Sequence, residues 1–221
     1  MSKRTLDPES TRASILEAAE ELFAAKGYDA VSMSDIGRAA GVTKSLIHHH
    51  FGAKEELWHA VKERCMSEYF TMQRHLLEQP QAAAGDLLRL SIETYFRFLQ
   101  KNPRVVRMQA WLDILQDPVM VAAAGSVTEL GQHRLRVGQQ HGEIRPALEP
   151  LHIIGCFLGM TEHWFRSRAV VCAKSGLSPD MPAEEFAALD ESFLQTMCGI
   201  FFDGVLTDAG RKAATAPPSR P

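Results

Sequence analysis

The sequence predicts an all-α protein, and three observations lead to that fold class. Apolar residues repeat at intervals of three and four along most of the chain, which is the period of an amphipathic helix. Glycine and proline fall at the ends of these segments, where helices stop and start. No segment alternates apolar and polar residues as a half-buried β-strand does. We therefore expect an N-terminal three-helix domain followed by a six-helix domain.

The first predicted helix begins at Pro8, with Asp7 as its cap, and ends at Lys26 before Gly27. Proline suits the first position of a helix because the N–H that it lacks has no partner there. The apolar face of this helix comprises Ile15, Ala18, Ala19, Leu22 and Phe23.

Two short helices around a tight turn are predicted next, between Ser32 and Lys54. Ser32 can cap a helix over residues 33–40, and an acidic residue three positions later can complete a capping box. Gly41 ends that helix, and Thr43 can cap a second one, which carries three consecutive histidines. This pattern is typical of a helix-turn-helix, in which the second helix enters the major groove of DNA.

The same signals predict six further helices, at residues 54–77, 86–100, 103–116, 118–141, 151–173 and 184–206. The last two are separated by a proline-containing loop and should form an antiparallel hairpin. The apolar stripe of the final helix is broader than one neighbour needs, so it packs either against a second subunit or within a simple core. We expect domains at 8–56 and 57–208, and a disordered tail at 209–221.

Composition limits the class of protein. The chain has 221 residues, 45% of them hydrophobic, and a net charge of -3; its first 64 residues hold nine basic and ten acidic side chains. Bulk charge thus gives no support for nucleic-acid binding, and a local positive surface that includes Lys3, Arg4 and Arg12 would have to supply it. The longest apolar stretch, residues 151–160, is too short to span a bilayer, so we expect a cytoplasmic protein. The four cysteines are widely spaced and are expected to be reduced, packed thiols.

Metal binding and catalysis are both disfavoured by the sequence. Consecutive helical residues point about 100° apart, so His48, His49 and His50 fan around the helix axis and cannot converge on one ion. No phosphate-binding glycine loop, nucleophile elbow or Cys-x-x-Cys motif is present. We expect no cofactor and no metal. The alternative from another class is a helical enzyme or metal-binding protein with an incidental helix-turn-helix-like segment.

Residues 11–57 closely resemble the DNA-binding domain of TetR-type bacterial transcription regulators. The resemblance rests on the spacing of several short motifs: Ile15-Leu16, Phe23, Gly27-Tyr28, Asp35-Ile36, Ala40-Gly41-Val42, His50-Phe51 and Lys54-Glu55-Glu56-Leu57. The remainder of the chain resembles the family only in its helical layout. The family implies a homodimer joined through the helices at 151–173 and 184–206, with one recognition helix of each subunit in successive major grooves.

The resemblance also implies residue roles. Base edges or adjacent phosphates would be met by Lys44, Ser45 and His49, and the DNA backbone by Ser32, Thr43, His48, His50 and Lys54. Tyrosines are common in the family at the positions of His48 and His49, so we expect operator binding to tighten as the pH falls from about 7.5 to 6, given a histidine reference pKa near 6.5. Ala53 lacks the hydroxyl common at its position, so the fourth helix would start with Gly52 or by packing alone.

The second domain is expected to hold an effector pocket if the resemblance extends to mechanism. Aromatic and methionine side chains at the centre of a helical bundle shape apolar cavities. The candidate wall residues are Tyr69, Phe70, Tyr95, Phe98, Met108, Trp111, Leu112, Met160, His163 and Trp164. The expected function is that of a dimeric repressor that binds an inverted-repeat operator and is released by a small apolar or amphipathic effector. Repression and activation both remain compatible with the sequence.

Overall fold

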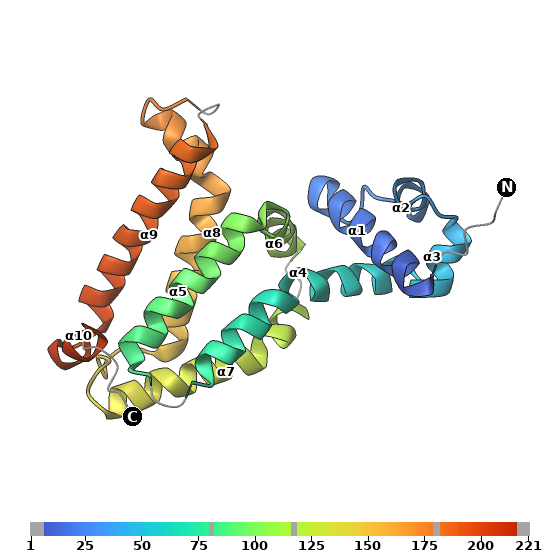
Figure 1. The fold of residues 1–221 in the computed structure, drawn as a ribbon. Helices are drawn as coiled ribbons and strands as arrows, with labels where there is room; N and C mark the ends of the chain where they lie inside the picture. The colour runs from blue at the N-terminus through green and yellow to red at the C-terminus, as the bar shows by residue number, and fades with distance from the viewer. Residues whose placement is uncertain (1–6, 80–81, 116–118, 179–181, 216–221) are drawn as a thin grey trace. The chain divides into compact units, whose positions relative to one another are not determined.

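The computed structural model describes residues 7–79, 82–115, 119–178 and 182–215, and within them the chain is helical (Figure 1). Ten helices occur in these ranges: α1 (Pro8–Lys26), α2 (Met33–Ala40), α3 (Lys44–Phe51), α4 (Lys54–Leu77), α5 (Ala84–Lys101), α6 (Pro103–Leu115), α7 (Val119–Gln140), α8 (Pro150–Lys174), α9 (Ala183–Val205) and α10 (Asp208–Thr215). The all-α prediction is confirmed. Among the described residues no helix combines the length and apolarity needed to cross a membrane.

The chain divides into two compact units, and the first contains α1, α2, α3, most of α4 and also α6. Asp7 caps α1 by accepting a hydrogen bond from the Ser10 amide, and Gly27 ends the helix with φ 78°. The core of this unit consists of side chains that are completely or almost completely buried: Ile15, Ala19, Phe23, Ile36, Ile47, Leu57 and Trp58. α6 packs along α1, so the three-helix domain that the sequence predicts gains a helix from later in the chain.

The second unit comprises residues 69–101 and 121–221 of the chain, and α5 lies at its centre, in contact with α8, α9 and α10. A buried carboxylate ties three of its helices together. Asp190 on α9 accepts hydrogen bonds from Trp164 Nε1 at 2.8 Å and Gln100 Nε2 at 3.1 Å, and pairs with Arg168 at 2.5 Å. Because this carboxylate is fully satisfied, its burial does not leave an uncompensated charge.

Burial of the apolar residues along α4 and α9 is uneven. Along α4, Met72 is 38% exposed, whereas the adjacent Gln73 is buried. Along α9, four residues of the predicted stripe are buried, namely Leu194, Met197, Phe201 and Leu206. Phe186, Leu189 and Phe193 are partly exposed, and Ile200 has 58% of its surface exposed. Cys156 is also exposed, unlike the three other cysteines, so the expectation that all four thiols are packed is wrong for this residue.

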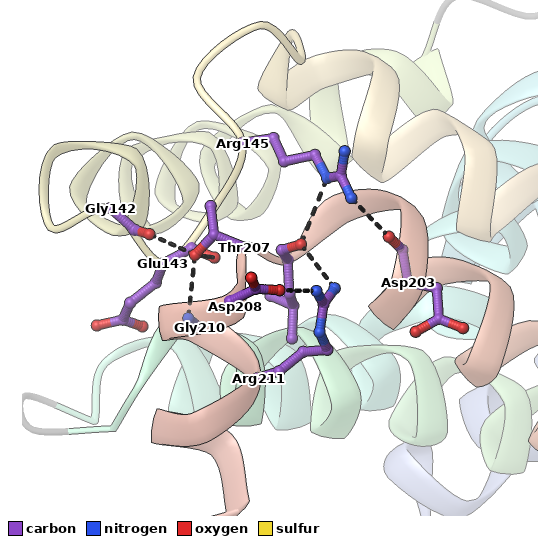
Figure 2. A network of polar contacts seen from close by, with 9 residues as sticks. Gly142, Glu143, Arg145, Asp203, Thr207, Asp208, Gly210 and Arg211 are labelled. Atoms are coloured by element: carbon purple, nitrogen blue, oxygen red, sulfur yellow. Dashed lines mark hydrogen bonds and ion pairs between the residues drawn. The ribbon is translucent and has the colours of Figure 1, made fainter.

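The predicted disordered tail from Ala209 is wrong for its first residues, because Asp208–Thr215 form α10; residues 216–221 lie outside the described part of the chain. Figure 2 shows how this end of the chain is held. Thr207 Oγ1 donates to the Gly142 oxygen at 2.5 Å and accepts from the Gly210 amide at 3.1 Å, while Arg145 Nη2 donates to the Asp203 oxygen at 3.0 Å. These contacts join the α7–α8 loop to the start of α10.

Candidate nucleic-acid interface and effector cavity

α2 begins with a complete capping box. The Ser32 hydroxyl accepts a hydrogen bond from the Asp35 amide at 3.1 Å, and the Asp35 carboxylate accepts from the Ser32 amide at 3.1 Å and from its hydroxyl at 2.5 Å. The hydrogen bond from the Ser32 side chain, followed by that from its backbone, lowers the pKa of Asp35. The predicted cap is therefore confirmed, and it fixes where the helix-turn-helix begins.

The turn and the second helix also follow the local sequence signals. Gly41 adopts a left-handed conformation with φ 69°, which glycine accepts without strain. Thr43 Oγ1 accepts the Leu46 amide at 3.2 Å and so caps α3. Ile47 is completely buried and Phe51 is 8% exposed, and these two side chains anchor one face of α3 to the core.

The opposite face of α3 is free to meet a partner. Of the eight predicted DNA-contacting residues, six are exposed and His50 and Lys54 are partly exposed; the exposed ones are Ser32, Thr43, Lys44, Ser45, His48 and His49. The hydroxyls of the two capping residues already serve helix amides. Of the basic residues predicted near the start, Lys3 and Arg4 lie outside the described residues, and the Arg12 guanidinium lies 4.7 Å from the Phe51 ring centre.

The three histidines of α3 point to different surroundings. His48 Nδ1 lies 2.8 Å from the Gly52 carbonyl oxygen, while the rings of His49 and His50 meet edge to face at 5.6 Å. In the described part of the chain, no group of three or more His, Cys, Asp or Glu side chains is placed to hold a metal ion.

The start of α4 differs from the expectation that Gly52 or packing alone would begin it. The Glu56 carboxylate accepts a hydrogen bond from the Ala53 amide, which is the glutamate half of a capping box without its hydroxyl half. Lys54 lies with Nζ 4.1 Å from the centre of the Tyr28 ring. At this predicted phosphate-binding position, the Lys54 ammonium group therefore lies over the Tyr28 ring. The Ala53 amide is already hydrogen-bonded to Glu56.

A largely apolar cavity lies in the second unit, between α4, α5, α7 and α8. The hollow measures about 650 Å³ when its part open to solvent is included, and the space that the centre of a water-sized sphere can occupy is about 80 Å³. Its walls include Tyr69, Phe70, Leu77, Leu88, Leu135 and Phe157. Burial raises the pKa of the Tyr69 phenol, and the Glu162 carboxylate adds to the rise.

Of the ten predicted effector-pocket residues, all of which are described, Tyr69 and Phe70 line this cavity. Tyr95 and Phe98 lie just behind Tyr69, with ring centres 4.8 and 5.6 Å from it. The Tyr95 hydroxyl is 2.6 Å from Glu162 Oε1. These two aromatic residues support the wall without lining it.

The remaining six predicted pocket residues lie elsewhere. Met108, Trp111 and Leu112 belong to α6 in the first unit, where Trp111 Nε1 donates to the Ala24 oxygen at 3.3 Å. Trp164 stacks on Phe193 at 4.3 Å. Met160 and His163 are also on α8 and are partly exposed and exposed, respectively.

Four polar cavity residues were missed by the sequence reasoning: Gln73, Ser91, Thr128 and Arg134. Gln73 on α4 and Ser91 on α5 both line the cavity and are bonded to each other, Gln73 Nε2 to Ser91 Oγ, at 2.7 Å. The signal in the sequence was available: Gln73 lies four residues after Tyr69 and four before Leu77, so it interrupts a helical apolar stripe.

Comparison with known proteins agrees with this geometry. Residues 15–61 match the family model for bacterial regulatory proteins of the tetR family. A curated relative, the HTH-type transcriptional activator FasR of Mycolicibacterium smegmatis, is 30% identical over 124 residues.

Residues 15–61 belong to the TetR family of helix-turn-helix transcriptional regulators. The match with FasR covers 56% of this chain and 56% of that relative, so this chain spans about half the length of the curated relative.

Solved structures show the same fold along most of the chain. The ketosteroid transcriptional regulator KstR2 of Mycobacterium tuberculosis has a TM-score of 0.65 at 18% identity, covering 89% of this chain and 95% of that one. AibR in complex with isovaleryl coenzyme A and operator DNA has a TM-score of 0.68 at 21% identity, covering 87% and 98%. The TetR fold therefore extends beyond the helix-turn-helix into the second unit.

Proposed function

We propose that this chain is a cytoplasmic, homodimeric repressor that binds an inverted-repeat operator through α3 and releases it when a small apolar or amphipathic effector enters the second unit. The observation that carries the proposal is the two-sided character of α3. Ile47 and Phe51 fix one side to the core, while Lys44, Ser45, His48 and His49 lie exposed on the other. Such a helix can reach base edges without losing its own support.

The dimer is proposed from the outer faces of α8 and α9. Gly155 and Gly159 on α8 and Gly199 on α9 have open space where a side chain would stand. Ile200, which follows Gly199 in the sequence, is 58% exposed. Glycines next to an exposed apolar residue allow helices of a second subunit to approach closely. Ile200→Glu should then convert the dimer to a monomer in sedimentation velocity. Ile114→Glu is the control, because Ile114 on α6 is 70% exposed but lies outside these helices.

The effector role is supported by the largely apolar cavity between α4, α5, α7 and α8. AibR, which shares the fold, binds isovaleryl coenzyme A together with operator DNA, and its example supports a small molecule as the signal. A thermal-shift screen of metabolites, acyl compounds and drugs, followed by operator-release assays, tests this role. Absence of any ligand response would contradict it.

A gel-shift with the DNA upstream of the chain's own gene tests the DNA-binding role. We expect a salt-sensitive, sequence-specific complex that is weakened when Lys44 is replaced by alanine. If Lys44 contacts a phosphate, the same substitution should reduce the slope of log affinity against log salt concentration by about one. Lys174→Ala is the matched control, since Lys174 is an exposed lysine at the end of α8. FasR is named an activator, so a reporter assay must accompany the gel-shift. If expression from the operator falls when the gene of this chain is deleted, the protein is an activator and the proposed repressor role is wrong.

A further inference from the structure

The cavity in the second unit contains an unsatisfied polar atom. Gln73 is 4% exposed, and its Nε2 donates to Ser91 Oγ at 2.7 Å. Its Oε1 is buried and has no hydrogen-bond partner among the described residues. Buried amide oxygens are nearly always paired in folded proteins, so an unpaired one in the wall of a cavity indicates a missing partner.

One end of the Gln73 side-chain amide is unpaired in either of its two orientations. If the amide were rotated by 180°, Oε1 would accept the Ser91 hydroxyl proton and Nε2 would become the unpaired atom. Ser91 offers a single oxygen, so it can satisfy only one end of the Gln73 amide in either orientation. A hydroxyl group on a ligand can donate and accept, and it would pair with whichever end is free.

The other polar groups of the cavity do not offer a ready site for an anion. Arg134 Nη2 donates to the backbone oxygens of Gln79 at 2.9 Å and Ala82 at 3.3 Å. Arg134 also lines a neighbouring hollow that contains Glu143. The Arg134 charge is therefore shared with backbone oxygens and lies near a carboxylate. Gln73 and Ser91, in contrast, line the apolar cavity but not the neighbouring hollow.

We propose that Gln73, positioned by Ser91, is the specificity-determining contact of the effector cavity, and that the effector is an uncharged apolar molecule carrying a hydroxyl group. The apolar body fills the space between Tyr69, Leu88 and Phe157, and the hydroxyl pairs with the free end of the Gln73 amide. A carboxylate at that point would lose its hydration without gaining a cation. This inference rests on the proposed effector role of the cavity and narrows it to one chemical class.

Calorimetry with matched probes tests the proposal. 1-Decanol, 1-chlorodecane and decanoate share a chain length and differ at one end, which is a hydroxyl, a group of similar size that does not donate, or an anion. For the wild-type protein we expect 1-decanol to bind more tightly than decanoate. Methionine has a length similar to that of glutamine and no amide. Replacing Gln73 by methionine should raise the ratio of the 1-decanol Kd to the 1-chlorodecane Kd by about tenfold or more.

Thr128→Val is the control variant, because Thr128 also lines the cavity but lies outside the Gln73–Ser91 pair. It should change the same ratio by less than about twofold. The ligand-free Gln73→Met protein should also melt at a higher temperature than the wild type, since the unpaired atom is gone. The melting temperature also reveals whether Gln73→Met disturbs the fold.

Three results would overturn the proposal: a Kd ratio that Gln73→Met leaves unchanged, tighter binding of decanoate than of 1-decanol, or no binding of 1-decanol up to its solubility limit. Because calorimetry uses no DNA, it separates this inference from the proposed function. A protein that retards operator DNA but does not discriminate the probes refutes the inference alone. A protein that discriminates them but binds no DNA refutes the regulator function alone.

Discussion

His48 Nδ1 lies 2.8 Å from the carbonyl oxygen of Gly52, and this contact assigns the proton on the ring. A carbonyl oxygen only accepts, so Nδ1 carries hydrogen and the exposed Nε2 of the neutral ring is an acceptor. A neutral acceptor repels a phosphate oxygen, whereas a protonated ring donates to it. In this tautomer a neutral His48 cannot donate to a phosphate through Nε2.

Operator affinity is predicted to rise as the pH falls from about 7.5 to 6, by about threefold or more. The sign follows from linkage: a phosphate beside the ring favours its charged form, so the complex binds more protons than the free protein. Fluorescence anisotropy with labelled operator measures the effect. Replacing His48 and His49 by glutamine should flatten the profile, while His133→Gln, an exposed histidine on α7, should leave it intact. Equal profiles for wild type and the double variant would contradict the prediction.

The capping box of α2 predicts a lowered carboxyl pKa. Hydrogen bonds from Ser32 hold the pKa of Asp35 below its ordinary value of 3.8. Stability from this interaction is present above the ordinary value and is lost as the pH falls through the lowered one. NMR titration should find that Ser32→Ala raises the Asp35 pKa, whereas Ser34→Ala, two residues further along the chain, should not. A value unchanged by Ser32→Ala would exclude the cap as its cause.

Two glycines of the DNA-binding unit should differ in their tolerance of alanine. Gly52 has φ 76° and ψ -126°, and a Cβ there would lie 2.8 Å from Glu56 Oε2. Gly41 also has positive φ, but nothing lies within 4 Å of the position that an alanine Cβ would occupy there. We expect Gly52→Ala to cost about 2–3 kcal/mol of unfolding free energy and Gly41→Ala about 1 kcal/mol, as measured by urea denaturation. A larger loss for Gly41→Ala would contradict the geometry of the α3–α4 junction.

Thiol labelling should report on the proposed dimer. Burial raises the pKa of Cys65 to about 12, so little reactive thiolate forms there. Cys156 is exposed in the single chain and lies beside Gly155 and Gly159 on α8. We predict that Ellman's reagent modifies Cys156 rapidly in dilute protein and more slowly as the dimer forms, while Cys65 stays unreactive throughout. A Cys156 rate independent of concentration in a dimeric protein would remove α8 from the interface.

Local signals were sufficient to predict most helix ends. Ser32 and Gly41 mark α2 because a hydroxyl cap and a left-handed glycine act within a few residues of the chain. The α10 helix could not be predicted in the same way. Its first turn depends on Thr207, which bonds to Gly142 across the α7–α8 loop, and such a distant partner leaves no local pattern.

The candidate effector site was predicted less well for a related reason. Periodicity tells which face of a helix is buried but not which element covers it. Trp111 and Met108 are buried or partly buried as expected for large apolar side chains, yet α6 lies in the first unit. Conversely, Gln73 was overlooked because a glutamine is usually exposed, although its position in an apolar stripe marked it as unusual.

The placement of α6 has a consequence for protein engineering. Because residues 102–120 belong to the same compact unit as residues 1–68, the DNA-binding part is not a continuous piece of chain. A fragment cut after residue 68 would lack Trp111 and the rest of α6, and would leave the side of α1 near Ala24 uncovered. Chimeric regulators made by joining foreign sensor domains at that point should therefore aggregate, unless the graft also carries α6.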